Sequence, residues 1–378
     1  MVKRRTVLWG LSAAAIAGCR PGNSSPLKVK LLARSVPSQV LKAFSRETPS
    51  RFDAEPTLID IYQQLQQWQA QTSPPPPPLW KRLLAIDSDS SLQGTSPKVD
   101  TSLVTLSDPW LEHAIRQNLI QPLPDFAPVE RLPEPWQRLL RRDRQGQSTA
   151  GGDLWAVPYR TQGLMIAYQK PIFKAADTKA ITKWADLWRP ELTGRIAMPD
   201  QPRLAVAIVL KALGYSVNDE EALTQDDVQE QLIALYRQVK VFDSQAYLKA
   251  LVNEDVWLAV GWSGDILATL VRYRKLMAVY PQEGSVLTND LWVAPVDAAI
   301  TSAAQAWMDF CWQLPIATQI SVSSYGVSPV FFSPDVNIPE SLSPQTFLMP
   351  EQGEVLLPLS DRGKTVLTEL FNAETFLE

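Results

Sequence analysis

The chain has 378 residues and a formal net charge of −4, with 36 Lys and Arg against 40 Asp and Glu. This balance argues against nucleic acid as a partner, because phosphate binding requires a basic surface. One histidine, His113, and two cysteines, Cys19 and Cys311, cannot assemble a metal site of the His/Cys kind. No G-x-S-x-G turn accompanies His113, so nothing indicates a serine hydrolase. We therefore expect neither an enzyme nor a cofactor, with His113 on a helix surface and Cys311 in a core.

The N-terminus has the pattern of a signal for export. Lys3, Arg4 and Arg5 precede an apolar stretch at residues 7–18, whose 12 residues are too few to span a bilayer. The stretch ends in I-A-G-C at Cys19, which resembles the lipobox of bacterial lipoproteins. That resemblance implies cleavage before Cys19 and a lipid anchor on it, which holds a protein lastingly on a membrane when several acyl chains are present. The alternative is an ordinary signal peptide, and the two arginines leave both the general and the twin-arginine export routes open.

The first part of the mature chain alternates strands and helices. Apolar patterning predicts strands at residues 27–33 and 103–106 and helices at 38–47, 58–68, 110–120 and 136–144. Between them, five consecutive prolines at 74–78 and a polar run at 87–98 indicate a loop-rich insertion. We interpret the proline run as a spacer, with an SH3-type ligand as the alternative.

The stretch I-T-K-W-A-D-L-W-R-P-E-L-T-G-R-I-A-M-P-D, residues 181–200, opens the second part of the chain. Thr182 is the expected N-cap of a short helix, Pro190 stops it, and Gly194 turns the chain into a buried strand that ends at Asp200. The same alternation continues with strands at 241–242, 256–260 and 291–294 and helices at 204–213, 228–239, 303–314 and 361–371.

This order predicts an α/β fold of two doubly wound lobes with a hinge. The chain leaves lobe one near 158–163 and returns near 284–290, which permits closure over a ligand. The expected organisation is a signal peptide (1–18), a lipidated tether (19–26), lobe one (27–159, with the insertion at 72–100), lobe two (160–289), a return to lobe one (290–335) and a C-terminal segment across the lobes (336–378). Cleavage removes three basic residues and no acidic one, so the net charge falls from −4 to −7.

The motif W-A-D-L-W-x-P-E-x-x-G-R-I at 184–196 closely resembles the bacterial extracellular solute-binding proteins of the spermidine/putrescine-binding type. The resemblance also rests on L-K-A-L-G-Y (210–215), A-V-G-W-S-G-D (259–265), L-W-V-A-P (291–295) and S-Y-G-V-S-P (324–329). The resemblance implies a fold similar to that of type II periplasmic binding proteins. In that family aromatic rings and carboxylates hold a linear polyamine, which suits an ammonium leaving water.

By this resemblance Trp262 is an aromatic wall, Asp290 the main carboxylate, Tyr325 a lobe-one tyrosine and Ser107 a hydroxyl beside the ligand. Asp200 and Asp265 are further candidate ligand-binding carboxylates. The chain departs from the family at Thr288, where an aromatic is usual, and at Leu204, where a glutamate is expected. Three arginines near strand ends would instead suit an anionic ligand: Arg34, Arg160 and Arg203.

The leading hypothesis is therefore a lipid-anchored, extracytoplasmic, monomeric receptor that captures a small solute and delivers it to an ABC permease, with a polyamine-like cation favoured. The alternative is a receptor-like lipoprotein that binds an anionic solute, or one whose altered cleft serves as a sensor or partner module. Ferric iron is disfavoured, because the adjacent tyrosine pair typical of the iron-binding relatives is missing.

Overall fold

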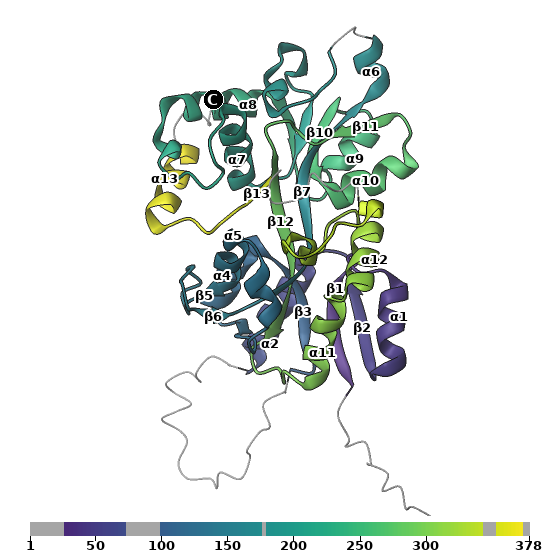
Figure 1. Ribbon diagram of the computed structural model, residues 1–378. Helices are drawn as coiled ribbons and strands as arrows, with labels where there is room; N and C mark the ends of the chain where they lie inside the picture. The colour runs from purple at the N-terminus through teal and green to yellow at the C-terminus, as the bar shows by residue number, and fades with distance from the viewer. Residues whose placement is uncertain (1–25, 73–98, 176–178, 343–352, 373–378) are drawn as a thin grey trace, which may run out of the picture.

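The computed structural model describes residues 26–72, 99–175, 179–342 and 353–372. The apolar leader, Cys19 and the proline run lie outside the described residues. Two lobes stand one above the other, and two long strands, β7 and β12, run between them (Figure 1). None of the helices within the described ranges has the length and apolarity needed to cross a bilayer.

Lobe one is built from the first part of the chain and from helices that follow the return crossing. Its elements are β1 (Leu27–Leu32), α1 (Ser38–Glu47), β2 (Ser50–Glu55), α2 (Leu58–Thr72), β3 (Leu103–Ser107), α4 (Asp108–Arg116), β4 (Ile120–Gln121), η1 (Ala127–Arg131), α5 (Glu134–Leu140), β5 (Arg141–Arg142), β6 (Asp153–Leu154), α11 (Ser302–Cys311), α12 (Leu314–Ser324) and η5 (Pro329–Phe332).

Lobe two lies between the crossings β7 (Val157–Gln169) and β12 (Ser285–Pro295), and a C-terminal tail follows lobe one. The elements of lobe two are α6 (Lys170–Ala175), η2 (Trp184–Trp188), η3 (Pro190–Leu192), β8 (Ile196–Met198), α7 (Pro202–Leu213), η4 (Ala222–Thr224), α8 (Asp226–Gln238), β9 (Val239–Phe242), α9 (Tyr247–Val252), β10 (Leu258–Trp262), α10 (Ser263–Arg272) and β11 (Leu276–Val279). The tail contributes β13 (Gly353–Val355) and α13 (Asp361–Asn372).

One continuous sheet connects the lobes, in the order β2-β1-β3-β12-β7-β10-β8-β9. The strands β1, β2 and β3 are parallel, as are β10, β8 and β9, but β12 and β7 run antiparallel to each other and to their outer neighbours. Residues 157–163 of β7 pair with β12, and residues 164–168 pair with β10. The predicted α/β fold class is confirmed, and the two crossing strands add antiparallel pairs to the parallel strands of each lobe.

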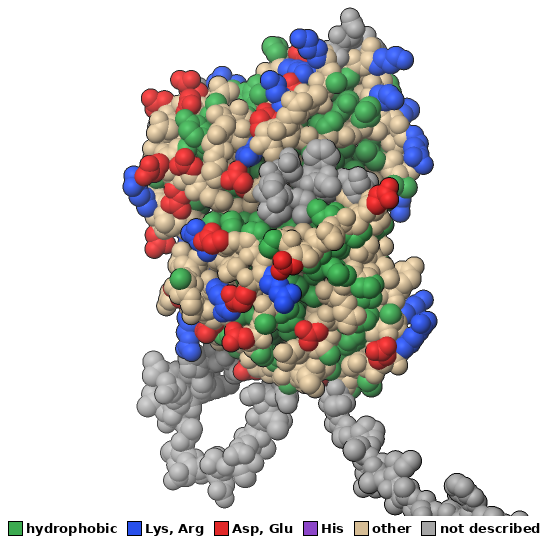
Figure 2. Space-filling view, viewed as in Figure 1, with side chains coloured by type: hydrophobic (Ala, Val, Ile, Leu, Met, Phe, Trp, Pro, Cys, Tyr) green, Lys and Arg blue, Asp and Glu red, His purple; other side chains and the backbone are tan. Residues whose placement is uncertain are grey.

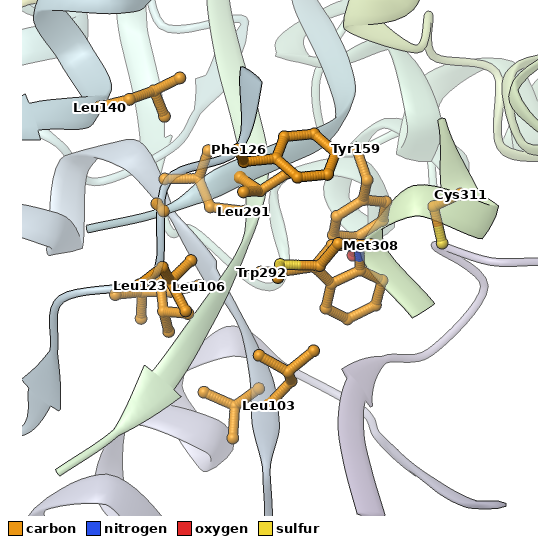
Figure 3. Packing of buried hydrophobic residues seen from close by; sticks show 14 of the residues in the cluster. Leu103, Leu106, Leu123, Phe126, Leu140, Tyr159, Leu291, Trp292, Met308 and Cys311 are labelled. Carbon is orange, nitrogen blue, oxygen red and sulfur yellow. The ribbon is translucent and has the colours of Figure 1, made fainter. Parts of the chain in front are cut away.

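Each lobe has its own apolar core. In lobe one, Tyr159 of β7 stacks on Trp292 of β12 with ring centroids 4.1 Å apart, and leucines of β3 pack nearby (Figure 3). Cys311 lies fully buried in this core, as predicted. The lobe-two core surrounds α7, which is apolar nearly all round and ends at Gly214 with φ 86°. Glycine suits this left-handed position because it carries no Cβ. His113 is exposed on α4, also as predicted.

Several local predictions need correction. The basic helix expected at 136–144 ends at Leu140, where the chain enters the short strand β5. The edge strand β2 and the helix α12 were not predicted. The sequence of β2 is S-R-F-D-A-E, and its polar residues leave too few apolar positions for a recognisable strand pattern. The helix expected after Thr182 is the 3₁₀ turn η2. Its N-cap is Lys183 rather than Thr182, and the Asp186 side chain accepts the backbone N–H groups of Thr182 at 2.7 Å and Lys183 at 3.1 Å.

The C-terminal tail contacts both lobes. Strand β13 pairs with β12 over Ser285–Leu287, and Glu354 accepts a hydrogen bond from Lys211 of α7 at 2.9 Å. Further along, Lys364 of α13 donates to Glu112 of α4 in lobe one at 2.5 Å. In the view of Figure 2, acidic side chains gather on the side of lobe two that carries α7, α8 and α13, while Lys and Arg line the opposite edge.

Candidate ligand-binding site

The strand ends that the sequence marked as functional meet where the two lobes join. Strand β3 ends at Ser107, which pairs with Asp290 on β12, and Asp290 in turn pairs with Arg160 on β7. The register of β12 and β7 shifts directly after Asp290, so the ladder is irregular at this point. On the lobe-two side, β10 ends at Trp262, and α10 begins with the next residue. Ligands of open α/β sheets bind beyond such strand ends.

Arg160 and Asp290 form a buried ion pair at this junction. The guanidinium Nε and Nη2 both lie 2.5 Å from Asp290 Oδ2, and Nη1 donates to the Ser324 carbonyl at 3.4 Å. Arg160 is 5% exposed and Asp290 1%. Burial opposes the charge on Arg160, but the Asp290 carboxylate outweighs this, so the pKa of Arg160 is raised above its ordinary value. The carboxylate that the resemblance assigns to a ligand is thus already paired within the protein.

The turn G-W-S-G-D at 261–265 forms the lobe-two wall. Gly261 is required there, because a Cβ would lie 2.0 Å from the Tyr247 ring. The Tyr247 hydroxyl donates to Asp265 Oδ2 at 3.1 Å and accepts from the Trp262 backbone N–H at 3.4 Å. Burial, with Asp265 nearby, raises the pKa of Tyr247 well above its ordinary value, so the hydroxyl keeps its proton. Asp265 is exposed and Trp262 is half-buried, so both are open to a solute.

Three hydrogen bonds join this turn to the crossing strand and to lobe one. The Gly264 N–H donates to Gln162 Oε1 at 3.2 Å, and the Gly163 N–H donates to Ser263 Oγ at 3.4 Å. Ser263 Oγ also donates to the Tyr325 carbonyl at 3.1 Å. Tyr325 is half-buried and holds a left-handed backbone, φ 54°, directly after α12. The turn that carries Trp262 is therefore held against the backbone of the predicted lobe-one tyrosine.

A second buried polar cluster lies beside Ser107. Asp108, the first residue of α4 and 4% exposed, accepts a hydrogen bond from Thr288 Oγ1 at 2.5 Å and one from Asn289 Nδ2 at 3.0 Å. Ser107 Oγ and Thr288 Oγ1 are 3.0 Å apart. Burial raises the pKa of Asp108 to about 6, despite the hydrogen bonds that favour the carboxylate. This cluster fastens α4 to the crossing strand β12.

Arg34, Asp200 and Arg203 are the remaining predicted residues. Arg34 is exposed in the turn after β1, with φ 67°, and Asp200 is exposed after β8. Arg203 donates from Nη2 to the Val217 carbonyl at 2.7 Å, and burial lowers its pKa to about 10. Val217 belongs to lobe two. So does Glu220, whose negative charge partly offsets the lowering of the Arg203 pKa. Of the three predicted arginines, Arg160 is thus the one that pairs with Asp290, whereas Arg203 bonds within lobe two.

Sequence reasoning missed Asp108, Gln162 and Asn289. Asp108 directly follows a buried strand, and this position is a signal that could have identified it. Gln162 and Asn289 lie inside the crossing strands, where nothing in the sequence separates a site residue from a structural one. Asn289 connects β12 to β7 and α5, because its Oδ1 accepts a hydrogen bond from Thr161 Oγ1 at 2.6 Å and one from Trp136 Nε1 at 3.0 Å. Within the described residues no group of three or more His, Cys, Asp or Glu could hold a metal ion.

Two α/β lobes, two crossing strands and a polar, aromatic junction between the lobes define the class of two-lobed ligand-binding proteins. The model of the family described as bacterial extracellular solute-binding protein matches residues 88–333. This range is more than half of the chain, so the chain belongs to that family.

Named relatives agree with this assignment. The spermidine/putrescine-binding periplasmic protein of Salmonella typhimurium is 27% identical over 195 residues, which are 50% of this chain and 55% of that protein. The chain thus spans about half the length of the curated relatives it matches. The solved spermidine/putrescine transporter substrate-binding protein PotD of Streptococcus pneumoniae has a TM-score of 0.68 at 17% identity, covering 94% of this chain and 99% of that one. A ferric binding protein from Campylobacter jejuni reaches 0.58 at 13% identity, covering 92% and 98%. The shared fold therefore leaves the ligand open.

Proposed function

We propose that this protein is an extracytoplasmic receptor that captures a small solute between its lobes and delivers it to an ABC permease. Membership of the solute-binding family supports this proposal, and the observation that carries it is the lobe junction itself. There Trp262 and Asp265 of lobe two remain accessible while the turn that holds them is bonded to Tyr325 of lobe one. An aromatic face and a carboxylate at a hinge suit a solute that closes the lobes.

A polyamine-like cation is the favoured ligand. The curated relatives include proteins named for spermidine and putrescine, and the accessible carboxylate Asp265 carries a negative charge at the junction. Since Asp290 is paired with Arg160, Asp265 takes the role of main counter-ion in this proposal. An anionic solute is the second candidate, because Arg160 holds a positive charge at the junction. A third is a sensor or partner module whose altered cleft takes no solute.

The proposed receptor is a monomer held on the outer face of a membrane by lipid on Cys19. Its lobes are residues 27–159 and 160–289, with 290–335 returning to lobe one and 336–378 spanning both. The I-A-G-C sequence supports the anchor, and the two antiparallel crossing strands support the boundaries.

A thermal-shift screen of the full chain tests the function. A ligand present at a hundred times its dissociation constant adds about 2.7 kcal/mol of stability, which such a screen detects. We expect shifts with polyamines or related amines and none with small dicarboxylates. A shift with carboxylates alone would select the anionic alternative. No shift across amines, carboxylates, amino acids and sugars would contradict the receptor function and favour a partner module.

A further inference from the structure

The charges at the lobe junction do not match those of a free diamine. Arg160 and Asp290 cancel, and Asp265 is the further acid that acts electrostatically on both members of the pair. Together the three groups carry one net negative charge. A desolvated ammonium needs its own counter-ion, so a ligand with a second ammonium here lacks a partner for it.

Arg160 is held by contacts on several sides. It sits directly opposite Asp290 in the ladder of β7 and β12, and its Nη1 reaches the Ser324 carbonyl. Gly326 closes over the arginine stem, since a Cβ on that glycine would lie 2.7 Å from Arg160 Cγ. The guanidinium thus pairs with the Asp290 carboxylate as a cation supplied by the protein.

We propose that Arg160 is a specificity-determining residue, which restricts the cleft to solutes with a single cationic group at this junction and excludes free diamines. The ligand class is an amine or guanidine whose other end is neutral, with Asp265 as its counter-ion and Trp262 against its carbon chain. This inference rests on the proposed receptor function, and it specifies the polyamine-like ligand as an amine that carries a single positive charge at this site.

The test compares two ligands of equal carbon spacing, putrescine with two ammonium groups and N-acetylputrescine with one, by isothermal titration calorimetry on the full chain in mild detergent. We expect the natural protein to bind N-acetylputrescine at least tenfold more tightly than putrescine. Arg160→Gln uncovers Asp290 and should reverse this preference. Arg189→Gln, which breaks the partly buried Arg189–Asp186 pair of lobe two, should leave the preference unchanged.

A double variant, Arg160→Gln with Asp290→Asn, provides a second test that does not depend on whether the single variant folds. It removes both charges and no net charge, so we expect it to retain the preference for N-acetylputrescine. Tighter binding of putrescine by the natural protein, or loss of N-acetylputrescine binding in the double variant, would overturn the inference. So would binding of neither amine. If neither amine binds but another solute raises the melting temperature in the thermal-shift screen, the receptor function still holds. If no solute in that screen raises the melting temperature, the receptor function is contradicted as well.

Discussion

Replacing Asp108 by asparagine should change how the stability of the protein depends on pH. The side chain is buried, its carboxylate accepts bonds from Thr288 and Asn289, and its pKa rises from 3.8 to about 6. Between these values the folded protein binds this proton more tightly than the unfolded chain does. The contribution of Asp108 to the free energy of unfolding is therefore greatest below about pH 4, falls as the pH rises to about 6, and is constant above that.

The size of the effect follows from the shift. Each pKa unit corresponds to about 1.4 kcal/mol, so the whole shift corresponds to about 3 kcal/mol, of which Asp108 should lose about 2 kcal/mol between pH 4 and pH 7. The asparagine side chain of the Asp108→Asn variant does not titrate, and its amide and carbonyl can still bond to Thr288 and Asn289. The free energy of unfolding of the variant, taken relative to that of the natural protein, should thus rise by about this amount between pH 4 and pH 7.

Urea unfolding followed by tryptophan fluorescence, at four pH values from 4 to 7, measures this difference in the same chain background. All other titrating groups are common to both proteins, so they cancel in the comparison. A constant stability difference across the range would refute the reasoning, because it would mean that Asp108 ionises in the folded protein much as it does in the unfolded chain.

Three further experiments test the junction and the anchor. Gly264→Ala should destabilise the chain by about 1–3 kcal/mol, because its Cβ would lie 2.3 Å from Gln162 Oε1, and adding Gln162→Ala should recover much of the loss in thermal unfolding. In titration calorimetry with a ligand amine, Asp265→Asn should weaken binding about a hundredfold or more and Trp262→Ala by about 0.5–2 kcal/mol, and the reverse order would contradict their roles. Cys19→Ala should move the protein from the detergent phase to the aqueous phase on phase partitioning; retention in the detergent phase would exclude the lipid anchor.

The sequence predicted those features that depend on neighbouring residues. The buried strand before Ser107, the helix α7 with its terminal glycine and the strand-to-turn geometry at Trp262 all follow from local apolar patterning and from glycine. The Arg160–Asp290 pair could not be predicted in this way, because 130 positions separate its members and it depends on the register of two antiparallel strands. The resemblance identified Asp290 but not the arginine that neutralises it. The cluster around Asp108 was missed for the same reason, since its partners lie 180 and 181 positions away.

The most direct test of the central claim is a crystal structure of the chain with a solute selected by the thermal-shift screen. The account predicts one solute molecule between the lobes, with its cationic group at the Asp265 carboxylate, its carbon chain against Trp262, and the Arg160–Asp290 pair intact beneath it. A solute bound elsewhere on the surface, or an ammonium on Asp290 with Arg160 displaced, would contradict it.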